Sequence, residues 1–202
     1  MSSDRQILLC GLGGQGVVLA GSLLERDNPR LRRILVDSAA DTVVLGEVVC
    51  ARRRELRLPD WRNRIPDGLQ LLPVDSRLLG RTDLQNYRAV ADWVASWHST
   101  GYFLRHGFGF CLLHGQQIVS LCTSPFVAGR QVELCIRTDP HYRSKGFATT
   151  TALAFIEHCL FNDLLPHWEC PWDHVASCAL AARLGFANPS DYLVYYWQTS
   201  SA

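Results

Sequence analysis

The sequence predicts an α+β fold, in which a twisted, mixed but mostly antiparallel sheet is flanked by helices. Three strand candidates, at residues 107–113, 118–124 and 131–138, are separated only by short turn-like segments, as in an antiparallel meander. Two helical patterns then alternate with two more strand candidates. A chain of 202 residues with this order of elements can form one large domain, or one domain with a substantial extension.

The first elements surround a run of glycines. Residues 6–10 are typical of a short buried strand, and the glycine-rich segment at 11–16 of a tight turn. The apolar residues 17–25 then predict a helix, which Asp27-Asn28-Pro29 ends.

The middle of the chain is less regular. Residues 33–36 and 42–49 are strand candidates rich in Val, Ile and Leu. Three prolines and many arginines interrupt residues 51–81, where we expect loops with short helical turns. Residues 83–97 carry apolar side chains at steps of three or four and therefore predict a helix.

The last third completes the alternation of strands and helices that follows the meander. Its predicted elements are a helix at 146–162, a strand at 167–170, a helix at 174–184 and a strand at 193–197.

The segment Arg143-Ser144-Lys145-Gly146-Phe147-Ala148 lies between the third meander strand and the helix that follows it. The first N–H groups of a helix have no internal partner, and the dipole there is positive. Gly146 and the small Ala148 let an anion approach the backbone closely, while Arg143 and Lys145 add charge. Such a turn can hold a diphosphate without a metal.

The same segment resembles the arginine-x-x-glycine-x-alanine signature of GCN5-related N-acetyltransferases (GNAT enzymes), and it follows an Asp-Pro-x-Tyr-Arg loop common in that family. Downstream, Leu180 to Phe186 resembles the family's second helix, which ends in Leu-Gly-Phe. Trp168-Glu169-Cys170 with His174-x-x-Ser177 further resembles the branch of zwittermicin-type antibiotic-resistance acetyltransferases.

The resemblance implies a site for acetyl-CoA as cosubstrate, with no metal. The diphosphate would lie on the helix start and the pantetheine arm on the edge of the third meander strand, which splays from the strand at 167–170. The implied coenzyme-binding residues are Ile136, Arg137, Thr138, Arg143, Ser144, Lys145, Gly146, Phe147, Ala148 and Thr149. Glu133 on the same strand would be the general base, although it could also be a solvent-facing residue in a salt bridge.

Two positions depart from the family pattern. Where many members carry a tyrosine acid for the leaving thiolate, this chain has Ala181, and the usual asparagine seven residues earlier is His174. His174 at a helix start is more typical of a cap than of an acid. Ser177 or Cys178 could donate the proton instead, or the thiolate could leave to solvent.

Composition narrows the function classes. Apolar residues make up 48% of the chain and charged residues 19%, which argues against disorder, and the net charge of +1 gives no sign of a nucleic-acid or membrane-surface binder. Eight scattered cysteines without a CxxC pair indicate buried thiols in a reducing, cytoplasmic setting, and we see no secretory signal. A zinc site at Cys170, His174 and Cys178 is the weaker alternative.

The glycines at the amino terminus give a competing signal. Gly11, Gly13 and Gly16 match the dinucleotide-binding pattern, with Asp37 at the distance of a ribose ligand. Residues 6–24, however, more closely resemble the opening of a gamma-type subunit of 2-oxoacid:ferredoxin oxidoreductases, which suggests a fused fragment. Too little chain lies between Asp37 and the first meander strand at 107–113 for a doubly wound sheet.

Together these patterns predict an enzyme that transfers the acetyl group of acetyl-CoA to a primary amine of a small molecule. They do not indicate an oligomeric state. We expect a strand-turn-helix extension at 1–26, an acceptor-side part at 27–100 and an acetyl-CoA-binding core at 101–202. The alternatives are a catalytically weak acyl-CoA-binding module and an oxidoreductase-related dinucleotide-binding protein.

Overall fold

The computed structural model describes residues 8–12, 16–20, 42–53, 58, 60–125, 127–171 and 173–198. The strands are β1 (Leu8–Leu12), β2 (Gly16–Ala20), β3 (Thr42–Arg53), β4 (Leu69–Pro73), β5 (Gly109–His114), β6 (Gln117–Thr123), β7 (Val127–Ala128), β8 (Gln131–Thr138), β9 (Leu165–Pro171) and β10 (Phe186–Gln198). The helices are α2 (Ser76–Leu79), α3 (Tyr87–Ala95), α4 (Thr100–His106), α5 (Phe147–Phe161) and α6 (Val175–Arg183), with short 3-10 turns η1 (Arg62–Arg64) and η2 (Pro140–Tyr142).

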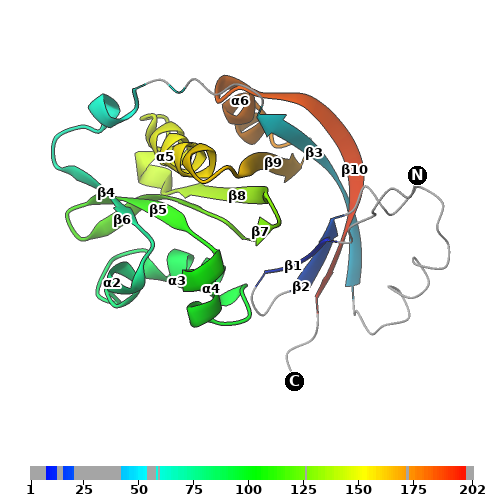
Figure 1. Cartoon of the computed structure of the whole chain (residues 1–202), viewed down its shortest axis with the longest axis horizontal. Coiled ribbons are helices and arrows are strands. Elements are labelled where there is room, and N and C mark those ends of the chain that lie inside the picture. The colour runs from blue at the N-terminus through cyan, green and yellow to red at the C-terminus, as the bar shows by residue number, and fades with distance from the viewer. Residues whose placement is uncertain are drawn as a thin grey trace.

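The strands form one sheet in the order β1-β2-β10-β3-β9-β8-β6-β5-β4, with β7 paired to β8 (Figure 1). Among the described pairs, β8 and β9 are parallel and the others antiparallel. The predicted α+β class and the mostly antiparallel sheet are therefore confirmed.

Helices cover both faces of the sheet. Figure 1 shows α5 and α6 on one side, and α2, α3 and α4 on the other. One hydrophobic core joins α5 and α6 to the sheet and includes Val132, Leu134 and Phe155. A second joins α3 and α4 to β5 and β6, and includes Val90 and Phe103. Strands β5 and β6 therefore contribute to cores on both faces of the sheet, whereas β8 and β9 pack against α5 and α6 on one face.

Sequence periodicity located the elements from β5 to α6 within a few residues, and the bounds of β8 coincide with the prediction. The exception is the two-residue β7, which lies in a segment expected to be a turn and pairs with the start of β8. Both β3 and β10 run beyond the strands predicted for them. The strand candidate at 33–36 and Asp37 lie outside the described residues.

Three elements differ from the sequence predictions. Residues 16–20 are a strand, β2, where a helix over 17–25 was expected: β2 pairs with β1 and β10, and the β-branched Val17 and Val18 favour this extended backbone. The 51–81 segment contains β4, which extends the sheet beyond β5. The helix α4, not predicted, begins where the Ser99 hydroxyl accepts a hydrogen bond from the N–H of Tyr102.

Two glycines give a matched test of this packing. A Cβ on Gly109 would lie 2.6 Å from Thr123 Cγ2 and 2.8 Å from the carbonyl oxygen of Cys122, so Gly109→Ala should destabilise the fold by about 1–3 kcal/mol. Gly101 lies in α4, and a Cβ there would meet nothing within 4 Å. Gly101→Ala should therefore stabilise the fold by up to about 1 kcal/mol. Denaturant unfolding of both variants measures the difference, and equal effects would contradict the packing at β5–β6.

Candidate active site

The site begins at β8, which changes partners along its length. Its first half pairs with β9, from Gln131 opposite Leu165 to Leu134 opposite Trp168. Its second half pairs with β6 on the other side, from Cys135 opposite Thr123 to Thr138 opposite Ser120. The described pairing between β8 and β9 thus stops after Leu134, so the two strands splay and leave a backbone edge open at residues 136–138.

A cleft of about 660 Å³ occupies this splay. It is bounded by the end of β8, the start of α5, the end of β9 and one side of α6, from Ala176 to Arg183. Its lining residues are Ile136, Arg137, Thr138, Tyr142, Arg143, Ser144, Gly146, Phe147, Ala148, Thr149, Glu169, Cys170, Pro171, His174, Ala176, Ser177, Leu180 and Arg183. The structure thus brings together all the predicted coenzyme-binding residues except Lys145, whose ammonium lies 4.9 Å from the centre of the Tyr142 ring.

The start of α5 presents unused hydrogen-bond donors to this cleft. Gly146 caps the helix in the left-handed region, with a φ of 82°, and Ser144 has a φ of 60°. The first helical hydrogen bond comes from the N–H of Thr150 to the carbonyl of Gly146 at 3.1 Å. Within the described part of the chain, the N–H groups of residues 147–149 donate to no acceptor. They are oriented by the helix and can bind an anion.

Hydroxyl groups fix this helix start against the sheet. The buried Ser120 hydroxyl lies 2.9 Å from that of Thr151 and 3.1 Å from that of Thr138. The Thr151 hydroxyl also donates to the carbonyl of Phe147 at 3.0 Å. Because these bonds connect β6, β8 and α5, the two walls of the cleft are held at a fixed spacing.

The loop between β8 and α5 is fixed by Asp139. Its carboxylate accepts hydrogen bonds from the N–H of His141 at 2.9 Å and the amide of Asn86 at 2.8 Å. The bond from the His141 N–H is the main reason that the pKa of Asp139 lies below its usual value, and the Asn86 amide lowers it further. Asp139 is therefore a loop anchor that stays ionised, and it does not face the cleft.

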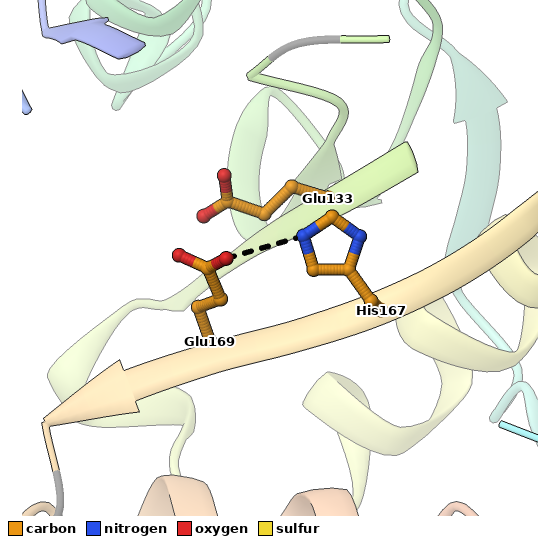
Figure 2. A group of neighbouring side chains, drawn as sticks. All are labelled: Glu133, His167 and Glu169. Carbon is orange, nitrogen blue, oxygen red and sulfur yellow. Dashed lines mark hydrogen bonds and ion pairs between the residues drawn. The ribbon is translucent and has the colours of Figure 1, made fainter. Parts of the chain in front are cut away.

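Three polar side chains converge on the face of the β8–β9 pair that points away from the core formed with α5 and α6 (Figure 2). Figure 2 shows Glu133 extending from β8 toward His167 and Glu169 of β9. One ligand atom from each of the three lies within 4.8 Å of the others, and His167 Nε2 lies 3.2 Å from Glu169 Oε1. The parallel register explains this grouping, because Glu133 is opposite His167, and His167 and Glu169 are two residues apart on one face.

This environment perturbs Glu133. Burial raises the pKa of Glu133 well above its usual range, and the charge of Glu169 raises it further. The side chains of His167 and Glu169 are only 8% and 13% exposed. Among the side chains that the structure describes, neither carboxylate has a lysine or arginine partner. Glu133 is therefore not the solvent-facing, salt-bridged residue that the sequence left open.

The groups considered as acids on α6 have structural contacts. His174 caps the helix, since its Nδ1 accepts the N–H of Ser177 at 3.0 Å, as its position suggested. The Ser177 hydroxyl accepts the indole N–H of Trp168 at 3.0 Å. Ala181 is buried in the core and has no proton to give. Of the three residues of the zinc alternative, Cys170 and Cys178 have their sulfur atoms 3.5 Å apart. The third, His174, uses its Nδ1 for the helix cap.

Sequence reasoning did not assign roles to Glu169, His167, Tyr142 or Arg183, all of which lie at the cleft or beside Glu133. The signal for the first two was period-two alternation in β9, where His167 and Glu169 alternate with the buried Trp168 and Cys170. The cross-strand register that pairs them with Glu133 could not be read from that pattern.

Comparison with known proteins places these features in context. Residues 37–195 match the family described as GNAT acetyltransferase. Over 133 residues, 66% of this chain, the sequence is 36% identical to YdfB, an uncharacterized N-acetyltransferase of Bacillus subtilis (strain 168). The matched region covers 50% of the length of that curated relative.

Solved structures show a similar fold. A GCN5-related N-acetyltransferase-like protein from Streptococcus suis 89/1591 superposes with a TM-score of 0.65 at 23% identity, covering 84% of this chain and 68% of that one. A GCN5-related N-acetyltransferase from Kribbella flavida gives 0.53 at 14% identity, covering 98% and 90%. The predicted GNAT-like fold is therefore confirmed. In the described residues, no helix is long and apolar enough to cross a membrane.

Proposed function

The chain belongs to the GNAT acetyltransferase family, and from this premise we propose that it transfers the acetyl group of acetyl-CoA to a primary amine of a small molecule. The observation that carries the proposal is the cleft at the β8–β9 splay, because it connects the anion-binding start of α5 with the Glu133–Glu169 pair. The helix start suits the phosphates of the coenzyme, and the end at Glu169 suits the thioester, beside the carboxylate of Glu133.

Acetyl-CoA would bind as the family pattern implies. The diphosphate lies on the N–H groups of residues 147–149, where Gly146 leaves the backbone open and Arg143 lines the cleft. The pantetheine arm extends β8 along its open edge, at Ile136, Arg137 and Thr138. This binding needs no metal. The thioester then reaches the splay beside Glu169.

The amine approaches from the opposite face of the sheet, where Glu133 accepts its proton. An ammonium group has no lone pair to attack a thioester, so the proton must leave first. The raised pKa of Glu133 makes this carboxylate a stronger base than an exposed glutamate, and Glu133 lies beside Glu169, which lines the cleft. Glu133 is the catalytic residue we propose.

A binding module without turnover is the second candidate, favoured by the absence of a hydroxyl at Ala181. The alternative of a dinucleotide-binding protein has less structural support than either of these two functions. A dinucleotide site needs a helix after the glycine turn, whereas here residues 16–20 are the strand β2.

Two measurements test these functions together. Thermal shifts with acetyl-CoA, CoA, NAD and FAD report binding, since a ligand at a hundred times its Kd stabilises by about 2.7 kcal/mol. Release of free CoA thiol with a panel of primary amines reports turnover. We expect stabilisation by acetyl-CoA and CoA, and amine-dependent thiol release. Binding without release would favour the module, and stabilisation only by NAD or FAD would reject both.

We further propose that residues 1–26 are separate from the coenzyme site and retain only a resemblance to an oxidoreductase fragment. Strand β1 pairs with β2, and β2 pairs with β10, so three strands of the sheet order separate β2 from β8. A chain that begins at Asp27 should lose stability, because it lacks the strand that pairs with β10 along that edge of the sheet. Its affinity for acetyl-CoA in calorimetric titration should equal that of the full chain. If the shorter chain folds but has lost its affinity for acetyl-CoA, residues 1–26 contribute to the coenzyme site and the proposed boundary is wrong.

We also infer a cytoplasmic location and membership of the zwittermicin-type branch. Cys111, Cys122, Cys159 and Cys170 are thiols with no disulfide, which suits a reducing compartment. The branch rests on the residues around Trp168 and Ser177, whose side chains are hydrogen-bonded to each other.

A further inference from the structure

Acetylation of an ammonium ion removes two protons from the same nitrogen. The first must leave before the nitrogen can attack, and the second leaves after the new C–N bond has formed. The leaving sulfur, meanwhile, departs with an electron pair and takes up one proton. A single base such as Glu133 accounts for only the first of these transfers, and Ala181 offers no acid for the thiolate.

Glu169 borders both parts of the site to which the proposed function assigns these protons. It lines the cleft that we assign to the thioester, and its carboxylate lies in the same group of side chains as Glu133. Glu133 does not line that cleft. Of the two carboxylates, Glu169 is therefore the one that reaches both the amine side and the sulfur side of the splay.

His167 holds Glu169 in this position. Its Nε2 lies 3.2 Å from Glu169 Oε1, and its side chain is only 8% exposed, so the contact is shielded from water. Strand β9 fixes the geometry, because the neighbouring Trp168 is buried in the core on the other face. A glutamate held in this way keeps its second oxygen available for another partner.

We propose that Glu169, positioned by His167, carries the second proton from the nitrogen to the leaving sulfur. Glu133 first takes one proton from the ammonium, and the nitrogen lone pair forms the C–N bond at the thioester carbonyl carbon. Glu169 takes the second proton from the nitrogen as the C–S bond breaks. The sulfur keeps that electron pair and receives the proton from Glu169, which gives the free thiol. Glu133 then releases its proton to solvent, so the site returns to its first state.

The inference rests on the proposed acetyl transfer, and Glu169→Gln tests it. Glutamine keeps the shape and a hydrogen bond to His167 but cannot carry a proton. We expect kcat to fall by about a hundredfold, the usual size of a general acid–base effect, with KM for acetyl-CoA within twofold of the original. The measurement is steady-state thiol release at saturating amine, on protein whose circular dichroism and coenzyme titration match the unsubstituted chain.

Chemical rescue separates proton transfer from structure. In Glu169→Ala, added formate or acetate should restore thiol release severalfold, whereas chloride at the same ionic strength should not. His167→Gln should lower kcat less than Glu169→Gln, because it removes only the positioning bond. As a matched control, Glu157→Gln on α5, whose carboxylate pairs with Arg62, should leave kcat unchanged. Ser177→Ala tests the rival acid at the cleft, and its loss of kcat should be smaller than that of Glu169→Gln.

Several results would overturn the proposal. They are a folded Glu169→Gln variant with normal kcat, an effect confined to KM for the amine, and a Ser177→Ala loss as large as that of Glu169→Gln. If the Glu169 variants do not fold, a proton inventory of the unsubstituted enzyme tests the proposal instead. A curved plot of kcat against the fraction of D₂O in the solvent supports two proton transfers, and a linear plot rejects the second transfer. If the unsubstituted chain binds acetyl-CoA but acetylates no amine, the proposed function fails and not this assignment alone.

Discussion

Gly146→Asp is expected to abolish the binding of acetyl-CoA while the protein stays folded. The substituted side chain would place a carboxylate at the positive end of α5, where the N–H groups of residues 147–149 are open to the cleft. A negative charge there repels the phosphates and can itself cap the helix. The φ of 82° at Gly146 adds backbone strain of about 1 kcal/mol, which the fold should tolerate.

Gly146→Asn is the matched control, because asparagine has the same shape and adopts the left-handed region about as readily as aspartate. It should lose part of the affinity through the bulk of its side chain, while aspartate should lose at least tenfold more. Isothermal titration of both folded variants with acetyl-CoA gives the comparison. Equal affinities for the two variants would show that charge at this position is irrelevant, and normal binding by Gly146→Asp would reject the phosphate assignment.

The backbone of the proposed coenzyme side could be predicted because its signals are local. A helix start with Gly146 in a left-handed conformation, a strand that leads into it and a charged residue at Arg143 all lie within a dozen residues of each other. Local sequence therefore specifies both the backbone shape and the chemistry. The open edge of β8 was expected from the family resemblance, and the pairing that ends at Leu134 agrees with it.

The acceptor side could not be predicted in the same way, because it depends on long-range pairing. Glu133 and His167 become neighbours only through the parallel register of β8 and β9, which a period-two pattern does not reveal. The raised pKa of Glu133 also depends on that pairing, since burial and Glu169 cause it. The sequence could therefore name Glu133 but left open whether it was buried or exposed.

The amino-terminal helix prediction failed for a related reason. Residues 17–25 are apolar, and a glycine turn before an apolar run is typical of a helix start. The extended backbone of β2 is satisfied by hydrogen bonding to β10, a strand that lies at the other end of the chain. Such a distant partner can override the local preference of a segment that contains Val17 and Val18.

Glu133→Gln is expected to lower the rate of amine acetylation by about 10²- to 10⁴-fold near neutral pH, the range of general base effects. Glu133 acts only as a carboxylate, so the rate of the unsubstituted enzyme should rise with pH through the raised pKa of Glu133. The variant should follow only the deprotonation of the free amine, and its deficit should shrink at high pH. A pH profile that is merely scaled by a constant factor would indicate that Glu133 is structural.

The same substitution should stabilise the fold at neutral pH. Because the folded-state pKa of Glu133 lies above its ordinary value of 4.5, the folded protein binds this proton more tightly than the unfolded chain does. Its contribution to stability is fully present below pH 4.5 and is lost as pH rises through the folded-state pKa. Removing the charge should therefore raise Tm, and the gain over the unsubstituted protein should grow from pH 4.5 upward.

Glu157→Gln should change Tm in the opposite direction in the same measurement. A hydrogen bond from Arg62 is the main reason that the pKa of Glu157 lies below its ordinary value, so this carboxylate stabilises the fold above that value and the contribution is lost as pH falls. The Glu157 variant should have a slightly lower Tm at neutral pH and an unchanged rate. Thermal unfolding across the pH range distinguishes the two. If Glu133→Gln loses stability with rising pH as the unsubstituted protein does, then Glu133 is not the buried, strained base that the proposed chemistry requires.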